Sequence, residues 1–372
     1  MKRIGLLTGG GDCPGLNAAI KWVVKTSEDP QPGVVPMEVI GIRDGWRGLV
    51  KGDPDRVLPP FADFGEEGYF KRLTSAEVRP WDRQGGTRLG TSRTNPFNPK
   101  DDRSAAVVRG IEKLGLGAVI AIGGEDTLGV AARLAEMGIT CLGIPKTIDR
   151  DLAGTDYSIG FETAVNVITD EVDRLRTTAG SHSRTFVVET MGRHAGHLAL
   201  QGGMSAGAYV ILIPECDFDV AEVNVLLARR RQSGIRYSIV VVAEGAKMCG
   251  GDLVVRNGKV DGFGHMTLGG VGELLARRIA EGTGIETRAV VLSHLQRGGT
   301  PCAYDRRMAR NFGIAAVNLV QAGQSARMVS FLGGRYTSVP LSEVVNRLCL
   351  VDVEREYDTT RYNGKRTILG LT

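Results

Sequence analysis

Short apolar runs, each closed by a glycine or a polar turn, recur along this chain and limit the folds that it can adopt. They are rich in β-branched residues and alternate with stretches of helical period such as 162–179 and 271–282. Strands that are apolar on both faces and alternate with helices indicate βαβ units, so we expect an α/β fold with mainly parallel sheets. The runs are RIGLLTGGG (3–11), MEVIGIRDG (37–45), AVIAIGGED (118–126), TCLGIPKTID (140–149), TFVVETMGR (185–193), AYVILIPE (208–215), YSIVVVAEG (237–245) and RAVVLSHLQRGG (288–299).

Length and composition narrow the class of protein. The 372 residues favour two domains, and the segments 28–36 and 52–102, rich in Pro, Gly and charge, are predicted to be surface loops. No apolar run is long enough to predict a signal peptide or a membrane span. The six cysteines form no CxxC pair, which is typical of reduced thiols in a cytoplasmic protein. A net charge of +4 suits a small anionic substrate and does not indicate nucleic-acid binding.

Several common nucleotide signatures are missing. TGGGDCPG is not the dinucleotide turn G-x-G-x-x-G, because Pro14 takes the last position, and no P-loop motif occurs. The two histidines of HAGH (194–197) are too close together for a zincin helix and are interpreted as surface or structural residues. The chemistry must therefore come from other loops.

Two glycine turns and one charged loop follow predicted strands. TGGGDCPGLN (8–17) brings bare backbone amides to the start of a helix, where an anion is favoured. GGEDT (123–127) repeats this turn with two carboxylates, which makes sense beside a phosphate if Mg²⁺ lies between them. IPKTIDRD (144–151) places a lysine, a threonine and two aspartates behind a strand. Each turn alone is also compatible with a simple structural role.

Arginines after strands or glycines form a fourth set, placed for bidentate contacts to phosphate. A single arginine of this kind is most often a solvated surface charge, but the set as a whole favours an anionic ligand. Together the loops predict phosphoryl transfer, with a metal carboxylate, a glycine turn, cationic clamps and an aspartate that takes a hydroxyl proton. The arginines lie in GGTRLGTSR (85–93), SHSRT (181–185), MGR (191–193) and TRAVVLSHLQRGG (287–299).

Seven motifs in this order closely resemble the 6-phosphofructokinase family, over roughly residues 1–330. They are TGGGDCPGLNAAI, GGTRLGTSR, GGEDT, PKTIDRD, SRTFVVETMGRHAG, VVAEG and LSHLQRGG. The resemblance implies two similar three-layer α/β/α domains with the active site in the cleft between them. Residues 1–160 plus 296–345 would form the phosphoryl-donor domain, and residues 161–295 plus 346–372 the fructose 6-phosphate domain.

The resemblance also implies roles for single residues. Asp149 would be the base for the 1-hydroxyl of fructose 6-phosphate, Thr147 would hold the phosphoryl group, and Arg193 would steady its charge. Glu125 would bind Mg²⁺ with Asp151 nearby. The remaining contacts would be Gly11 and Arg93 to the phosphoryl donor, Met191, Gly192 and Glu244 to the sugar, and His294 and Arg297 to the phosphate of fructose 6-phosphate.

Two further arginines imply an oligomer. In the family, the residues matching Arg184 and Arg288 reach the sugar phosphate from a neighbouring subunit, so we expect a homodimer or homotetramer with shared active sites.

Asp126 and Lys146 bear on the phosphoryl donor. The ATP-dependent branch carries glycine at both positions, which leaves room for the nucleotide. The carboxylate of Asp126 would occupy and repel the α-phosphate region, and Lys146 would add a cation for a smaller donor. The pair therefore resembles the pyrophosphate-dependent type. Arg43 stands where the ATP-dependent type commonly has an aromatic residue, which points the same way. ATP dependence stays open as an alternative, and a dinucleotide-binding oxidoreductase as a remote one.

Arg150 departs from the family pattern, where asparagine or glycine is commoner. Its cation could pair with Asp151 or lower the basicity of Asp149.

Overall fold

Two sheets organise the computed structural model of this chain, which describes residues 2–29, 34–251, 254–260 and 266–369. The first sheet has eight strands in the order β16-β15-β8-β7-β1-β2-β4-β3, and the second has four in the order β10-β11-β9-β14. In the first sheet β1, β2, β7, β8 and β15 run parallel, and all pairs of the second sheet are parallel. The predicted α/β fold with mainly parallel sheets is thus confirmed.

Four of the five parallel strands of the first sheet overlap the apolar runs predicted from the sequence, and the fifth, β15, does not. Its parallel strands are β1 (Arg3–Thr8), β2 (Glu38–Ile42), β7 (Leu116–Gly123), β8 (Cys141–Pro145) and β15 (Arg327–Leu332). Every residue of β8, and all but the first one or two of β1 and β7, are buried, as strands covered on both faces require. The edge strands are β16 (Arg335–Pro340), which is antiparallel to β15, and β3 (Val57–Leu58), which pairs with β4 (Phe70–Leu73). β4 is antiparallel to β2.

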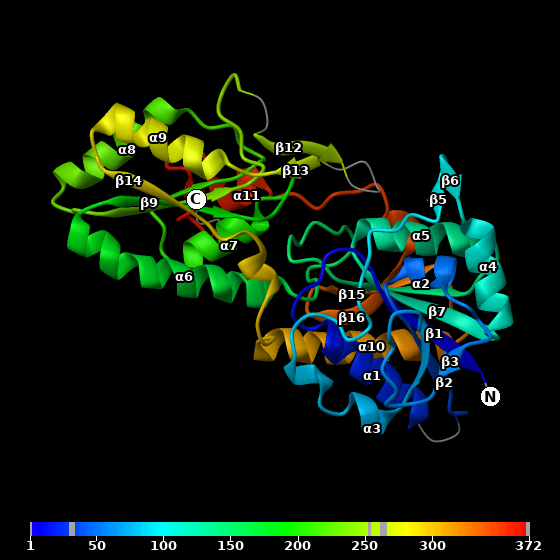
Figure 1. Cartoon of the computed structure of the whole chain (residues 1–372). Helices are drawn as coiled ribbons and strands as arrows, with labels where there is room; N and C mark the ends of the chain where they lie inside the picture. Colours follow the sequence, from blue (N-terminus) through cyan, green and yellow to red (C-terminus); the bar gives the residue numbers. More distant parts are fainter. Residues whose placement is uncertain (1, 30–33, 252–253, 261–265, 370–372) are drawn as a thin grey trace.

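Helices cover both faces of this sheet. Figure 1 shows α1 (Leu16–Glu28) and α10 (Ala303–Gln321) on one side and α4 (Ser104–Lys113) and α5 (Glu125–Glu136) on the other. α2 (Trp46–Lys51) packs on α4, and α3 (Ser75–Val78) and η1 (Trp81–Arg83) pack on α1. The result is a three-layer arrangement.

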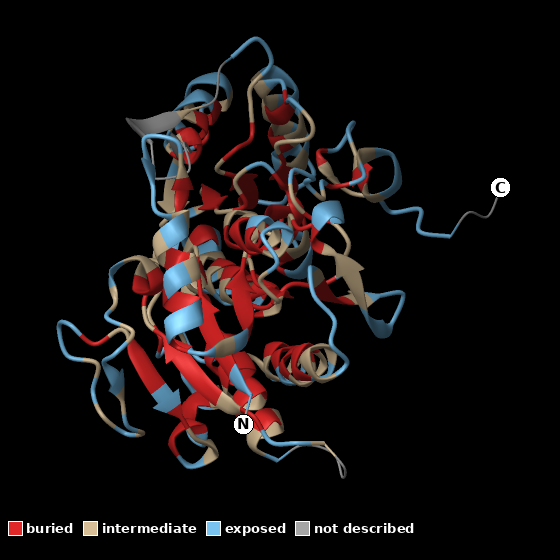
Figure 2. Cartoon of the chain, turned by 90° about the vertical axis from the view of Figure 1, so that its right-hand side faces the viewer, coloured by how far each residue is buried: buried red, intermediate tan, exposed pale blue. Residues whose placement is uncertain are grey.

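The second sheet has the same layered construction. Its strands are β9 (Thr185–Thr190), β10 (Val210–Leu212), β11 (Ser238–Ala243) and β14 (Thr287–Val291). α6 (Phe161–His182) and α7 (His197–Ser205) lie on one face, and α8 (Val220–Gln232) and α9 (Val271–Thr283) on the other. Figure 2 shows that buried residues concentrate in the strands and on the inner faces of the helices. The smaller elements are β5 (Phe97–Asn98), β6 (Asp101–Asp102), β12 (Val255–Val260), β13 (Met266–Leu268), η2 (Ser293–Arg297), η3 (Leu341–Glu343), α11 (Val353–Glu356), β17 (Tyr357–Asp358) and β18 (Asn363–Gly364).

The chain passes between the two sheets more than once. It leaves the first sheet after β8, builds the second, and returns through α10 to add β15 and β16. Buried Asp305 of α10 accepts hydrogen bonds from the backbone amides of Gly160 and Thr163, at 2.7 and 2.8 Å, and from the Tyr157 hydroxyl. One carboxylate therefore joins the start of α6 to the returning helix. The domain boundaries drawn from the sequence stay a prediction.

The interpretation of 52–102 as a surface loop was wrong in part. Phe70, Leu73 and Trp81 are buried, because the segment supplies the strand β4, which pairs antiparallel with β2, and η1, which packs against α1. Of the segment 28–36, residues 30–33 lie outside the described residues.

Candidate active site

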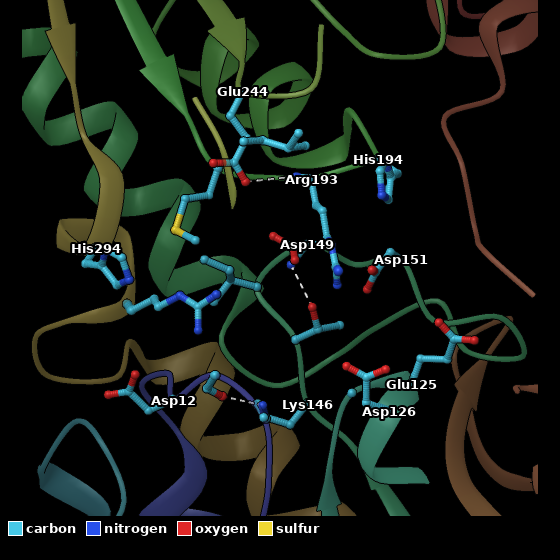
Figure 3. A pocket seen from close by; sticks show the side chains of 18 of the residues that line it. Asp12, Glu125, Asp126, Lys146, Asp149, Asp151, Arg193, His194, Glu244 and His294 are labelled. Atoms are coloured by element: carbon cyan, nitrogen blue, oxygen red, sulfur yellow. Dashed lines mark hydrogen bonds between the residues drawn. The ribbon is translucent and has the colours of Figure 1, made fainter. Parts of the chain in front are cut away.

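A cavity of ≈ 470 Å³ lies where strands of both sheets end. Its walls come largely from the residues that follow β1, β7, β8, β9, β11 and β14 at their carboxyl ends, which is where ligands bind in parallel α/β sheets. Most of the residues expected from the sequence share this cavity (Figure 3), namely Gly11, Arg93, Glu125, Asp126, Lys146, Thr147, Asp149, Met191, Arg193, Glu244, His294 and Arg297.

Asp149 sits on the loop that follows β8. Its backbone amide donates to Thr147 Oγ1 at 3.1 Å, and the Ser158 hydroxyl donates to the Thr147 carbonyl at 2.7 Å, so the loop is held from within. Asp149 Oδ1 is buried and has no hydrogen-bond partner among the described residues. A buried carboxylate oxygen without a donor is costly, and a ligand hydroxyl in the cavity would satisfy it.

The electrostatic surroundings of Asp149 act in opposite directions. Burial raises the pKa of its carboxyl, while the cations of Arg297, Arg193 and Lys146 lower it. A carboxylate with little hydration but three nearby cations is suited to accept a proton from a bound alcohol.

Lys146 lies under the first glycine turn. Its side chain is buried, and Nζ donates to the Gly11 carbonyl. Burial lowers the pKa of Lys146 to about 8. Gly11 packs directly on the guanidinium of Arg297, and a Cβ at position 11 would overlap Arg297 Nη1. Gly11 thus allows Lys146 and Arg297 to approach the same point.

Carboxylates gather on the other side of the cavity. Glu125 and Asp126 open α5, and Asp151 faces them from the loop after β8 (Figure 3). Glu125 Oε1 accepts from the Asn346 amide at 2.8 Å. Burial and the neighbouring Asp149 raise the pKa of Asp151 to about 7.

This acidic side fits Mg²⁺. The described residues contain no group of three or more His, Cys, Asp or Glu side chains arranged as a closed metal site. Mg²⁺ needs no such group, since it keeps several waters and takes one or two carboxylates plus substrate phosphates. A cation near Asp151 would also offset the cost of ionising that buried carboxyl beside Asp149.

The opposite wall carries the residues expected to hold the sugar. Gly192 does not line the cavity, but its φ of 133° turns the chain so that Met191 and Arg193 on either side of it do. The Arg193 amide donates to Glu244 Oε1 at 3.3 Å. Burial, together with nearby Asp149, raises the pKa of Glu244 to about 7.

His294 and Arg297 approach from η2. His294 Nδ1 lies 3.0 Å from Ser293 Oγ, and Arg297 Nε is buried without a hydrogen-bond partner among the described residues. Arg297 therefore has an unused donor in the cavity wall, as expected of a residue that binds an anion.

Arg184 and Arg288 lie away from this cavity. They flank the starts of β9 and β14, whereas the cavity lies at the other ends of these strands. Both reach Glu286, Arg184 Nε at 2.7 Å and Arg288 Nη2 at 2.9 Å. A single chain does not bring them to the site, and their action from a neighbouring subunit stays a prediction.

Arg150 is directed elsewhere than the sequence suggested. Its Nε donates to the Asp156 carbonyl at 3.0 Å, and its guanidinium lies 5.5 Å from the Phe161 ring centroid. No ion pair with Asp151 is present among the described residues. Arg43 also lies outside the cavity. Its Nε is 3.8 Å from Asp44 Oδ2, and its guanidinium lies over the Phe64 ring.

Sequence reasoning missed several lining residues. His194 lines the cavity and is an exposed residue, and His197 is buried as a structural residue would be, so both agree with the interpretation of HAGH. Glu189 also lines it and accepts from the amides of Gly270 and Gly272 at the start of α9. A carboxylate inside the apolar run TFVVET was the available signal for Glu189; Leu348 gave none.

Comparisons with known proteins agree with this geometry. The family described as phosphofructokinase matches residues 3–320. Pyrophosphate–fructose 6-phosphate 1-phosphotransferase of Amycolatopsis methanolica is 49% identical over 97% of this chain and 100% of its own length. ATP-dependent 6-phosphofructokinase of Corynebacterium efficiens is 42% identical over 95% of this chain and 96% of its own.

A solved structure shows the same architecture. Phosphofructokinase from Saccharomyces cerevisiae superposes with a TM-score of 0.76 at 30% identity. The match covers 92% of this chain and 45% of the longer yeast chain.

Proposed function

Because this chain belongs to the phosphofructokinase family, we propose that it is a pyrophosphate-dependent 6-phosphofructokinase. It transfers a phosphoryl group from pyrophosphate to the 1-hydroxyl of fructose 6-phosphate, giving fructose 1,6-bisphosphate and phosphate, and the reaction is reversible. Pyrophosphate is the donor because Lys146 puts a buried ammonium beside the Gly11 turn while Asp126 occupies the start of α5. The relative of highest identity quoted above carries that activity in its name.

Asp149 carries the chemical step. Its unpartnered Oδ1 takes the proton of the sugar 1-hydroxyl, whose oxygen then attacks the terminal phosphorus of pyrophosphate. The bond from that phosphorus to the bridging oxygen breaks, and phosphate leaves. Thr147 donates to the transferring group and Arg193 neutralises the charge that grows on it, which is most of what phosphoryl transfer requires of a protein.

The donor lies between the glycine turn and the acidic side. Gly11 lets phosphate oxygens approach the backbone, and Lys146 and Arg93 supply positive charge. Glu125, with Asp151, would hold Mg²⁺, which neutralises donor charge and orients the phosphates.

The sugar is held on the second sheet. Met191 and Glu244 contact the ring with Gly192 shaping that turn, and His294 and Arg297 bind the 6-phosphate end. Arg184 and Arg288 complete the phosphate site of a neighbouring subunit in a homodimer or homotetramer. The donor side then belongs to residues 1–160 plus 296–345 and the sugar side to 161–295 plus 346–372.

The enzyme acts in the cytoplasm, which the six free cysteines support. No helix in the described part of the chain is long and apolar enough to cross a membrane. Nucleic acid is not a partner.

ATP dependence is the second candidate, because the Corynebacterium relative is named an ATP-dependent enzyme. A dinucleotide-binding oxidoreductase is no longer a candidate, since the family match covers most of the chain.

An assay with fructose 6-phosphate, Mg²⁺ and either pyrophosphate or ATP tests the proposal. We expect fructose 1,6-bisphosphate with pyrophosphate, and formation of pyrophosphate when fructose 1,6-bisphosphate and phosphate are supplied. Turnover with ATP alone would support the second candidate, and turnover with neither donor would refute both.

A further inference from the structure

Residues 345–351, which we term the strap, run across the acidic side of the active site. Figure 1 shows the chain between β16 and α11 crossing from the half built on the first sheet to the half built on the second. The strap lies beyond the part of the chain that matches the family, residues 3–320. Its side chain of Leu348 lines the cavity.

Hydrogen bonds hold the strap to the half built on the first sheet and then, further along the chain, to the half built on the second. The Asn346 amide donates to Glu125 Oε1 at 2.8 Å, and the Cys349 amide donates to the Asp151 carbonyl at 2.8 Å. Leu348 forms an antiparallel bridge with Leu152.

Its far end is fixed to the half built on the second sheet. His197 Nε2 donates to the Cys349 carbonyl at 3.1 Å, and the Val351 amide donates to Glu215 Oε1 at 2.8 Å. Burial lowers the pKa of His197 to about 4, so its ring is neutral at pH 7 with one N–H to donate. Four backbone contacts within six residues thus hold the strap in one register.

Two of these contacts reach the residues that the proposed function assigns to Mg²⁺. The Asn346 amide donates to Oε1 of Glu125, which restrains the orientation of that carboxylate. The Cys349 amide fixes the backbone of Asp151 on the facing loop. One segment therefore contacts the carboxylate of Glu125 and the backbone of Asp151.

Asn346, whose amide donates to Glu125, has an uncommon backbone conformation. Its φ is 61°, in the left-handed region that Gly and Asn adopt readily and β-branched residues avoid. The side chain is exposed, so this position requires a residue that tolerates the left-handed backbone and not one that makes a packing contact.

We propose that Asn346 is a positioning residue for donor binding, which acts by orienting the carboxylate of Glu125 toward the metal–pyrophosphate complex. The inference rests on the proposed function, because it takes Glu125 as a ligand of the donor's metal. Its effect falls on binding of the metal–donor complex and not on binding of the sugar, whose site lies across the cavity.

The test is calorimetric titration of the whole protein with Mg²⁺–methylenediphosphonate, a pyrophosphate mimic that cannot transfer its phosphoryl group. Asn346→Val forces a β-branched residue into the left-handed region and should weaken this affinity by roughly 10-fold, with the KM for fructose 6-phosphate unchanged. Asn346→Gly should keep the affinity, and Asn346→Ala should fall between, which leaves a graded series if the valine variant does not fold.

A matched control separates strain from positioning. Ala326, exposed at the start of β15 with a φ of 55°, does not line the cavity. Ala326→Val places similar strain elsewhere and should leave the affinity for Mg²⁺–methylenediphosphonate unchanged. An equal loss in Ala326→Val would mean that the effect is general destabilisation and would overturn the inference.

A double-mutant cycle with Glu125 distinguishes failure of the inference about Asn346 from failure of the metal assignment of Glu125. Glu125→Ala should itself weaken binding, and adding Asn346→Val to it should cause no further loss, because the residue acts through that carboxylate. Two results would overturn the inference and leave the metal assignment intact. The first is that the losses from the two substitutions add up. The second is that Asn346→Val keeps the wild-type affinity while Glu125→Ala loses affinity. Wild-type affinity in Glu125→Ala would contradict the metal assignment itself, and the inference with it.

Discussion

At the scale of single residues, the site depends on charges taken out of water and placed near one another. Burial raises the pKa of Asp149 even though three cations nearby act to lower it, and burial near a like charge raises the pKa of Asp151 and of Glu244 to about 7. Burial thus favours the protonated form of all three carboxyls, and the cations around Asp149 act against it there.

Replacing Asp149 with Asn should lower kcat by about 10²- to 10⁴-fold, because the amide cannot take the hydroxyl proton. The KM for fructose 6-phosphate should change little, since shape and neighbouring cations are kept. Steady-state kinetics measure both. Asp170→Asn, an exposed acid on α6, is the control and should leave both constants unchanged. Near-normal turnover of Asp149→Asn would mean that another group is the base.

The ionisation of Lys146 should make the KM for pyrophosphate depend on pH. Its pKa is lowered to about 8, so the ammonium is present below that pH and is lost as the pH rises through it. The KM for pyrophosphate should therefore rise above about pH 8 more steeply in the wild type than in Lys146→Gly. Both proteins meet the same ionisation of pyrophosphate, so a parallel rise in the two profiles would contradict the role of Lys146.

At the scale of elements, strands and helices were predictable because their signals are local. Strands β1, β7, β8 and β9 appear in the sequence as apolar runs because they are buried on both faces. The residues that follow them form the loops of the site. The strap was not predictable, because its contact between Asn346 and Glu125 joins residues far apart in the chain and uses a backbone amide. The orientation of Arg150 was missed for a related reason, since its partners depend on the fold of the following loop.

The junction of α6 and α10 depends on Asp305. It is buried and accepts from two backbone amides and from the hydroxyls of Tyr157 and Thr163. Asp305→Ala leaves several buried donors without an acceptor and should cost about 3 kcal/mol or more of unfolding free energy. Asp219→Ala, which removes the exposed N-cap of α8, is the control and should cost about 1 kcal/mol. Urea unfolding followed by circular dichroism compares the two, and equal losses would show that the junction adds no special stability.

At the scale of the whole molecule, the proposed phosphate site needs residues of a second chain to be complete. The sequence motifs predicted which residues meet in one cavity, but no signal within a chain shows where a second chain lies. Arg184 and Arg288 instead meet Glu286, on the side away from the cavity.

Mixing Arg184→Ala with Asp149→Ala subunits should restore part of the activity, because one interface of a hybrid then holds both intact residues. Each charge-assisted phosphate contact contributes about 1.5–3 kcal/mol, so the arginine variant alone should be clearly impaired. Native mass spectrometry verifies that hybrids have formed, and each variant mixed with itself is the control. Hybrids without restored activity would contradict a shared site.

The choice of donor is the central claim, and kcat/KM for pyrophosphate and for ATP across four proteins tests it most directly. The wild type should use pyrophosphate and use ATP poorly or not at all. Asp126→Gly should raise the value for ATP while pyrophosphate still binds through Lys146. Lys146→Gly should cripple the use of pyrophosphate, since a buried charge-assisted contact is lost.

The double glycine variant should move the preference toward ATP, as the two positions then match those of the ATP-dependent branch. The ratio of the two kcat/KM values should therefore shift in the same direction at each step from the wild type to the double variant. A wild type that prefers ATP, or an Asp126→Gly variant whose value for ATP does not move, would contradict the account.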